Sequence, residues 1–380
     1  MPLEPLDRRR LRLRPLGERQ NRVNIERDAV MPDGEPGELS QAAQEVVSET
    51  AGRIAEARRA GRPVMMAFGA HTIKNGLGPV LVHMMEKGWL THLATNGAGI
   101  IHDWELAFQG ETSEHVEANV ADGSFGAWEE TGYYVNLALL VGAWRGLGYA
   151  ESVGALIEDE GLEVPSRGRL VEELKEDLDQ KPLPERAAGA ADLLRAVDSF
   201  ELPAGRLEVP HPYKQFSPQA AARRLGIPLT GHPMLGHDII YIHPLNDGGA
   251  VGRAGLRDFL TFARGVSELS GGVYMSVGSA VMSPMIFEKS MSMAQNLALQ
   301  GGRHIEGHFI TVVDLAESTW DWSKGEPPET HPDYYLRYCK TFHRMGGELR
   351  YARADNRDFL LALCRELARC RGGSPRRRKE

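Results

Sequence analysis

Short apolar runs alternate with amphipathic segments along most of this chain. Residues 64–68 form a continuous apolar run, which is typical of a strand buried on both faces of a parallel sheet, and Trp89, Leu90, Leu93 and Ala94 form a second short apolar run that predicts a buried strand. Further strands are predicted at 237–243, 272–277, 308–314 and 348–352, and segments with helical spacing separate them. Strands that alternate with helices of about ten to fifteen residues indicate βαβ units. The pattern predicts an α/β fold with a doubly wound, mainly parallel sheet.

The helical pattern also divides the chain. Ser40 is the expected cap of a first helix that ends before Gly61 and Pro63, and residues 129–225 form a predicted helical insertion. Residues 1–38 are rich in Arg, Pro and Gly without sustained periodicity, which predicts an extended or partly disordered N-terminal arm. We therefore expect three parts: the arm (1–38), a single α/β domain (39–370) and a basic disordered tail (371–380).

Composition narrows the possible functions. A net charge of -8 over 380 residues argues against a nucleic-acid-binding body. No apolar run approaches the roughly 20 residues of a membrane span, and no signal peptide is predicted. The three cysteines lack CxxC spacing, which favours a reducing, cytoplasmic environment, and no metal site is predicted because HxH and HExxH patterns are absent.

The stretch from Leu93 to Glu105 predicts a strand, a tight turn and the start of a helix. Gly97 and Gly99 would let a phosphate or sugar approach the backbone, although such a turn also occurs purely to reverse the chain. A second small, polar loop, Gly69–Gly76, follows the preceding predicted strand. Ligands of open α/β sheets bind beyond the carboxyl ends of the strands. Both loops are therefore candidate ligand contacts.

Two further groups of side chains could supply chemistry. His71, His102, His237 and His243 fall at or near predicted strand ends, where they could transfer protons or be hydrogen-bonded structural groups. Trp320 and Trp322 lie in a polar loop, where they could line an amine pocket through cation–π contacts or anchor the loop. The sequence leaves both pairs of alternatives open.

Four segments of the chain, together with its C-terminal part, resemble the deoxyhypusine synthases. The segments are the loop 70–76, the turn Thr95–Asp103, the stretch 235–243 containing Asp238, and Val277-Gly278-Ser279-Ala280-Val281. Pro332-Asp333, followed by Lys340, is similar to the segment that carries the family's active-site lysine. The resemblance covers residues 45–128 and 225–370.

The resemblance implies a Rossmann-like NAD-binding topology and a homotetramer. It implies an NAD-dependent transferase that moves an aminoalkyl group from spermidine or a related polyamine, through an imine on Lys340, to an acceptor amine such as a protein lysine. A nucleophilic lysine must be neutral, and burial beside Tyr338 and Phe342 would favour that form. The alternative is a solvated lysine on the exposed face of the 333–345 helix.

The expected site residues follow from the resemblance and the candidate groups. Lys340, His102 and Asp321 are the catalytic candidates, and the substrate candidates are His243, Glu317, Trp320, Trp322 and Tyr338. The expected NAD contacts are Lys74, Asn75, Thr95, Asn96, Gly97, Ala98, Gly99, Asp103, Asp238, Gly278, Ser279, Ala354 and Asp355.

Some positions depart from the family pattern. Ser283-Pro284-Met285 replaces a histidine pair, Ile101-His102 replaces an acidic pair, and Lys74 replaces a serine. Three hypotheses therefore remain. The protein is an NAD-dependent transferase using Lys340, an NAD-binding α/β enzyme with a different reaction on an amino compound, or a non-catalytic nucleotide-binding or interaction protein.

Overall fold

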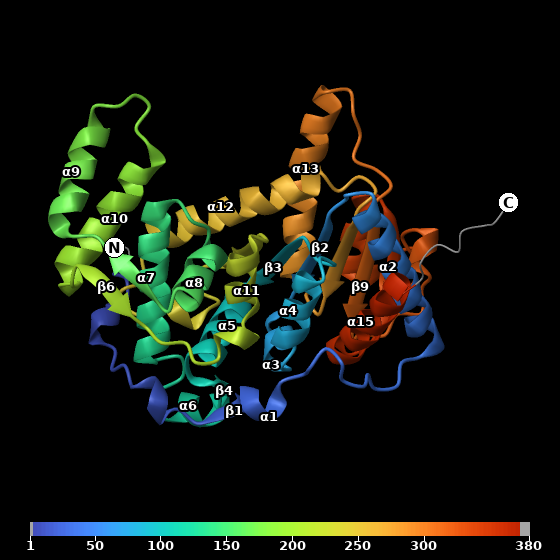
Figure 1. The fold of residues 1–380 in the computed structure, drawn as a ribbon, viewed down its shortest axis with the longest axis horizontal. Coiled ribbons are helices and arrows are strands. Elements are labelled where there is room, and N and C mark those ends of the chain that lie inside the picture. Colours follow the sequence, from blue (N-terminus) through green and yellow to red (C-terminus); the bar gives the residue numbers. More distant parts are fainter. Residues whose placement is uncertain (1–2, 373–380) are drawn as a thin grey trace. The chain divides into compact units, whose positions relative to one another are not determined.

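The computed structural model describes residues 3–372 (Figure 1). By its internal contacts the chain divides into two compact units. Unit one comprises Met1–Asp28, Asn96–Arg224 and Thr230–Asp258, and unit two comprises Ala29–Thr95, Leu225–Leu229 and Phe259–Glu380. The domain boundaries expected from the sequence stay predictions. Of the expected basic tail, residues 371 and 372 end a helix and the rest lies outside the described residues.

One six-stranded sheet confirms the predicted fold class. Its strand order is β7-β3-β2-β8-β9-β10, and the pairings of β2 with β3, β2 with β8, β8 with β9, and β9 with β10 are parallel. The strands are β2 (Val64–Phe68), β3 (His92–Asn96), β7 (Leu229–His232), β8 (Val273–Val277), β9 (Phe309–Asp314) and β10 (Glu348–Arg353). From β2 the chain adds β3 and β7 on one side, and then β8, β9 and β10 on the other. This is the Rossmann-like, doubly wound order.

Helices cover the strands of unit two. They are α2 (Gln41–Arg59), α3 (Ala70–Lys74), α4 (Gly78–Glu86), α13 (Met282–Gln300), α14 (Arg337–Arg344) and α15 (Asn356–Gly372). Ser40 caps α2 as predicted, because its side chain accepts a hydrogen bond from the amide of Ala43. Helices α2 and α15 pack side by side (Figure 1). All five residues of β2 and of β8 are buried, as expected for central parallel strands.

Unit one is mainly helical. Its helices include α1 (Ile25–Asp28), α5 (Gly97–Gln109), α6 (Val116–Ala121), α7 (Glu129–Arg145), α8 (Tyr149–Glu158), α9 (Arg167–Leu178), α10 (Glu185–Phe200) and α11 (Pro218–Leu225). Helix α12 (Gly248–Ser267) begins in unit one and ends in unit two. Two antiparallel pairs were not predicted: β1 (Asn21–Asn24) with β4 (Glu111–Glu114), and β5 (Gly161–Val164) with β6 (Gly205–Glu208). Strands of four residues are too short to show a clear period.

Two predicted elements are wrong. Residues 237–243 form no strand; Ile239–Tyr241 is a 3-10 helix, and the sixth strand is the earlier segment Leu229–His232. Ile242 has helical backbone angles (φ -72°, ψ -38°), which a strand does not allow. The predicted helix 333–345 is divided into a 3-10 helix, Pro332–Tyr335, and α14, because Leu336 has a non-helical ψ of 72°.

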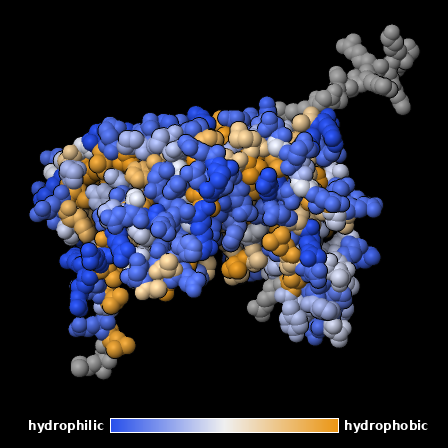
Figure 2. All heavy atoms as spheres, turned by 90° about the horizontal axis from the view of Figure 1, so that it is seen from below, coloured by the Kyte–Doolittle hydropathy of each residue, from blue (hydrophilic) through white to orange (hydrophobic). Residues whose placement is uncertain are grey.

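The described part of the chain has no helix that is both long and apolar enough to cross a bilayer. The face in Figure 2 is covered mainly by hydrophilic residues, with smaller apolar areas among them. Within residues 3–372, no group of three or more His, Cys, Asp or Glu side chains is arranged to hold a metal ion.

A buried carboxyl group in unit one makes stability depend on pH. Asp258 accepts hydrogen bonds from the amides of Ala150 (3.0 Å) and Gly231 (2.6 Å), and its burial raises its pKa to about 7. An acid with a raised native pKa contributes full stability below its unfolded pKa, near 4, and loses that contribution as the pH rises through about 7.

We expect this loss to be absent in Asp258→Asn, because the amide does not titrate. Between pH 5 and pH 8 the free energy of unfolding of the wild type should fall by about 2 kcal/mol relative to that of the variant. Urea unfolding across this range measures the difference. Parallel pH profiles for the two proteins would contradict the assignment.

Candidate functional site

The sheet reverses its direction of growth between β2 and β8. In doubly wound sheets this switch point is where ligands bind, outside the carboxyl ends of the strands. Gly69 follows β2 and Gly278 follows β8, and the two residues are in close contact. A Cβ atom on Gly69 would lie 2.2 Å from the carbonyl oxygen of Gly278. The edge is thus formed by closely packed backbone, which explains why both positions are glycine.

We expect Gly69→Ala to destabilise the protein by roughly 1–3 kcal/mol, because the new methyl group would collide with main-chain atoms that cannot move independently. Gly52→Ala on α2 is the matched control, since a Cβ atom there meets nothing within 4 Å. That control should be neutral or slightly stabilising. Urea unfolding compares them, and equal stability of both variants would contradict the packing argument.

Four of the expected NAD contacts lie at the carboxyl ends of two strands in unit two. Gly278 and Ser279 follow β8, and Ala354 and Asp355 follow β10. Gly278 has a φ of +58°, and a Cβ atom there would meet the side-chain amide of Asn356 at 2.5 Å. That amide donates to the Thr72 hydroxyl at 3.2 Å. Sequence reasoning missed Thr72 and Asn356, because neither matches a recognisable motif.

The other unit-two candidates are placed more simply. The Thr95 hydroxyl donates to the carbonyl of Phe68 at 3.0 Å, which joins the ends of β3 and β2. Lys74 is the last residue of α3 and Asn75 caps its C-terminus. Lys74, Asn75 and Thr95 are therefore all close in sequence to the carboxyl ends of β2 and β3.

In unit one, the Asp238 carboxylate lies against the start of α5. A Cβ atom on Gly97 would be 2.1 Å from Asp238 Oδ2, so this side chain fills the space that the glycine leaves. Asn96 caps the helix by accepting from the amide of Gly99 at 2.9 Å, and Ala98 is its second residue. Burial raises the pKa of Asp238 to about 6, and Oδ2 has no hydrogen-bond partner in the described part of the chain.

Asp103 and His102 form hydrogen bonds inside unit one. Asp103 Oδ2 accepts from the Ser217 hydroxyl (2.7 Å) and from the side chain of Gln219 (2.9 Å), and burial raises the pKa of Asp103 to about 6. His102 Nδ1 lies 2.7 Å from the hydroxyl of Thr112. These contacts connect α5 with its neighbours in the fold, and they favour the structural alternative for His102.

The other three candidate histidines differ in exposure. His243 is buried, its Nε2 lies 3.5 Å from Glu129 Oε1, and burial lowers its pKa. His71 lies on α3 and is exposed, and His237 is exposed as well. The structure therefore brings no two of these four side chains into a described hydrogen bond with one another.

Lys340 is largely covered by two neighbours. Its Nζ lies 3.5 Å from the ring centroid of Tyr334 and 3.6 Å from Glu326 Oε1, and its side chain is 15% exposed. Both an aromatic face and a carboxylate attract a positive charge. Lys340 is therefore not a fully solvated surface lysine. Neither Tyr334 nor Glu326 was expected as a contact, because the loop that carries Glu326 has no periodic pattern.

The polar loop before α14 is organised around Asp333. Its Oδ2 accepts from the amides of Thr319 and Trp320, both at 2.7 Å. Burial alone would raise the pKa of Asp333, but these hydrogen bonds outweigh it and the pKa is lowered. The buried Trp322 donates to the Ser318 hydroxyl at 3.0 Å. These contacts favour the anchoring alternative for Trp322.

The remaining substrate candidates have partners within unit two. Trp320 donates to the carbonyl of Gly325 at 2.7 Å. Asp321 accepts from Ser323, and the exposed Glu317 pairs with Arg353 at 2.7 Å. Tyr338 is the second residue of α14, and burial raises its pKa to about 12. No described hydrogen bond or ion pair links Asp321 or Glu317 to Lys340.

Comparisons with known proteins give only distant likenesses. No family model and no curated protein match the chain. Among solved structures, a LOR/SDH-type protein from Methanococcus maripaludis S2 is 14% identical with a TM-score of 0.43, over 90% of this chain and 74% of that one. AgrE in complex with ornithine and NAD+ is 13% identical with a TM-score of 0.43, over 87% of this chain. The matched region is 34% of the AgrE chain.

A protein from Entamoeba histolytica that is named as a deoxyhypusine synthase also matches. It is 9% identical with a TM-score of 0.35, over 85% of this chain and 89% of that one. Likenesses at these TM-scores carry no argument about activity. The functional conclusion therefore depends on this chain's own residues and strand order.

Proposed function

We propose that the protein is an NAD-dependent enzyme that acts on an amino compound. The observation that carries the proposal is the strand order, whose switch point lies between β2 and β8. The motif resemblance around Gly278 and Lys340 supports the same function.

Two polar side chains at this edge could contact a dinucleotide. The Ser279 hydroxyl follows β8, and the Asp355 carboxylate follows β10, with β9 between the two strands. Gly278, Ser279, Ala354, Asp355 and Thr95 are the unit-two residues that would hold NAD, which supplies hydride transfer when bound. Lys74 and Asn75, and the unit-one candidates Asn96–Gly99, Asp103 and Asp238, stay predictions.

Lys340 is the proposed nucleophile for an aminoalkyl group from spermidine or a related amine. Once a hydride had been taken from the donor carbon, the Lys340 nitrogen would add to that carbon and form a C=N bond, and the donor's remaining amine would leave with a proton. An acceptor amine would then displace Lys340 from the C=N carbon in the same way, and return of the hydride would reduce the new C=N bond to a secondary amine. The Arg344 guanidinium, through its hydrogen bonds to Glu326, lowers the pKa of that carboxyl group, so Glu326 holds a cation rather than taking a proton. A cationic polyamine beside Lys340 would instead favour the neutral amine by like-charge repulsion.

A second reaction on the same fold is favoured by one observation. The Ser283 hydroxyl, where the resembled family has a histidine pair, is buried 2.8 Å from the Tyr274 hydroxyl, and the Ser283 amide donates to Ser279. This segment is therefore tied into the core and offers no imidazole. An NAD-dependent reaction on another amino compound is the alternative. The protein-lysine acceptor, the homotetramer and the cytoplasmic location stay expectations.

Calorimetric titration with NAD tests the coenzyme part of the proposal. Ser279→Ala should weaken NAD binding several-fold, because a lost neutral hydrogen bond is worth about 1 kcal/mol. Ser270→Ala, before the opposite end of β8, is the matched control and should bind like the wild type. If NAD does not bind the wild type, the coenzyme assignment is wrong and the non-catalytic interaction hypothesis gains support.

A further inference from the structure

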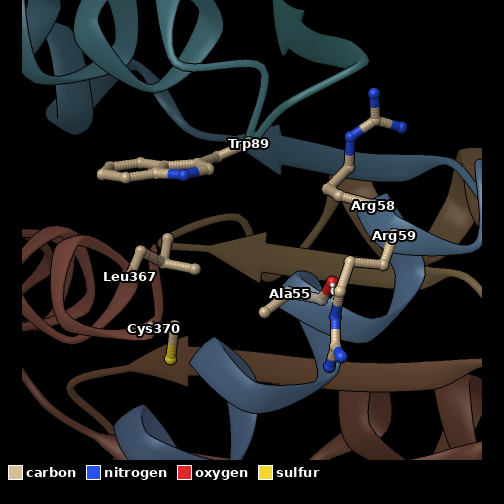
Figure 3. A pocket seen from close by; sticks show the side chains of 6 residues that line it. All are labelled: Ala55, Arg58, Arg59, Trp89, Leu367 and Cys370. Atoms are coloured by element: carbon tan, nitrogen blue, oxygen red, sulfur yellow. Dashed lines mark hydrogen bonds between the residues drawn. The ribbon is translucent and has the colours of Figure 1, made fainter. Parts of the chain in front are cut away.

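A separate cavity lies at the amino-terminal edge of the sheet in unit two. Its volume is about 400 Å³, and it is lined by Ala55, Arg58, Arg59, Trp89, Leu367 and Cys370 (Figure 3). Helix α2 ends just before β2 begins, Trp89 lies just before β3, and α15 reaches this edge at its C-terminal end. The cavity is thus at the opposite edge of the sheet from the proposed NAD contacts.

Apolar groups form one part of the cavity. Figure 3 shows the Trp89 indole edge-on above Leu367, with Ala55 and Cys370 below them. Trp89 is buried, and its ring packs edge-to-face on His83 with centroids 5.5 Å apart. Leu367 is buried as well. Both side chains are held by packing, so they form a fixed apolar wall of which only a small part faces the cavity.

Two arginines, Arg58 and Arg59, line the other part of the cavity. Arg58 donates to the carbonyl oxygens of Gly88 (2.8 Å) and Arg62 (2.9 Å), and Arg59 donates through Nε to the carbonyl of Ala55 (3.2 Å). Neither guanidinium forms an ion pair within residues 3–372, whereas Arg53 on the same helix pairs with Glu348.

The two guanidinium groups extend in opposite directions in Figure 3, so one small anion would not contact both. Arg59 uses a single N–H group in its hydrogen bond, and a guanidinium has five. Arg59 is therefore the better placed donor for a ligand.

We propose that this cavity binds a flat organic anion, with an aromatic body against Trp89 and Leu367 and a carboxylate or phosphate on Arg59. Planar guanidinium groups bind both kinds of anion, often through two parallel hydrogen bonds. The ligand is therefore an aromatic carboxylate or a nucleoside monophosphate, and the two share this chemistry. The proposal is independent of the NAD site and of Lys340.

Cys370 provides a direct probe of occupancy. Its side chain is exposed and lines the cavity, whereas Cys339 and Cys364 are buried. Burial raises the pKa of the Cys364 thiol to about 12 and raises that of Cys339 as well, so both stay protonated and unreactive. Iodoacetamide should therefore alkylate Cys370 selectively, and a ligand in the cavity should slow that reaction.

The experiment measures the rate of Cys370 alkylation in the full-length protein. The probes are indole-3-acetate and AMP, each paired with an uncharged counterpart, indole-3-acetamide and adenosine. We expect saturable protection by at least one acidic probe, and which of them protects identifies the ligand class. The uncharged counterparts should protect at least fivefold more weakly.

Arg59→Gln should raise the concentration needed for half-protection about fivefold or more, since a charge-assisted hydrogen bond at a partly exposed site is lost. Arg357→Gln, an exposed arginine at the start of α15, is the matched control and should leave protection unchanged. The proposal is overturned if neither acidic probe protects, if the uncharged counterparts protect equally, or if Arg59→Gln protects like the wild type.

Discussion

Lys340→Arg is expected to reduce the NAD-dependent cleavage of spermidine at least a thousandfold. Arginine keeps a positive charge beside Tyr334 and Glu326, so the local contacts of the helix are retained. Its guanidinium stays protonated and cannot form an imine, and loss of a covalent nucleophile costs several orders of magnitude in rate. The measurement is the release of 1,3-diaminopropane from spermidine in the presence of NAD.

Lys324→Arg is the matched control for this prediction. Lys324 lies in the preceding loop, its side chain is 73% exposed, and it pairs with Asp321 at 3.3 Å. Its replacement should leave the rate unchanged. If Lys340→Arg retained wild-type activity, Lys340 would not be the nucleophile, and the alternative NAD-dependent reaction would be preferred.

Arg19→Ala should destabilise the protein by about 3–5 kcal/mol, because it leaves the buried carboxylate of Glu105 without its counter-charge. Arg19 donates two hydrogen bonds of 2.7 Å to Glu105, and both side chains are 1% exposed. Thr112 and Thr131 also donate to this carboxylate. The loss would be measured as the change in the free energy of unfolding in urea.

An exposed ion pair of the N-terminal arm (residues 1–38) is the control for Arg19→Ala. Arg14 pairs with Asp122 at 3.0 Å, but the two side chains are 39% and 48% exposed. Arg14→Ala should therefore cost at most about 1 kcal/mol. If Arg19→Ala and Arg14→Ala were equally stable, the buried Arg19–Glu105 pair would not stabilise the folded protein more than the surface pair does.

The central strands were predictable because they are local apolar runs, whereas β7 (Leu229–His232), which reads Leu-Thr-Gly-His, was missed. Val64–Phe68 and Gly272–Val277 are bounded by Gly or Pro and buried on both faces, so their sequence alone indicates a central strand. By contrast, His237–His243 has a strand-like composition, but Ile239–Tyr241 forms a 3-10 helix and Ile242 has helical backbone angles. Short apolar runs of this kind are decided by tertiary context.

The candidate site was predictable only where a motif marks a backbone requirement. Gly278 needs a positive φ, and Gly69 needs room for the carbonyl of Gly278, so both positions depend on glycine. The neighbours of Lys340 could not be predicted, because Glu326 and Tyr334 reach it through an irregular loop and a 3-10 helix. The buried Arg19–Glu105 pair joins residues 86 positions apart, and no periodic pattern records such a contact.

The most direct test of the account is to trap the imine on Lys340. The protein is incubated with NAD and spermidine, reduced with borohydride, digested and analysed by mass spectrometry. The account predicts an aminobutyl adduct on the peptide that contains Lys340, dependent on NAD and absent from Lys340→Arg. An adduct on another lysine, or none although NAD binds, would contradict it.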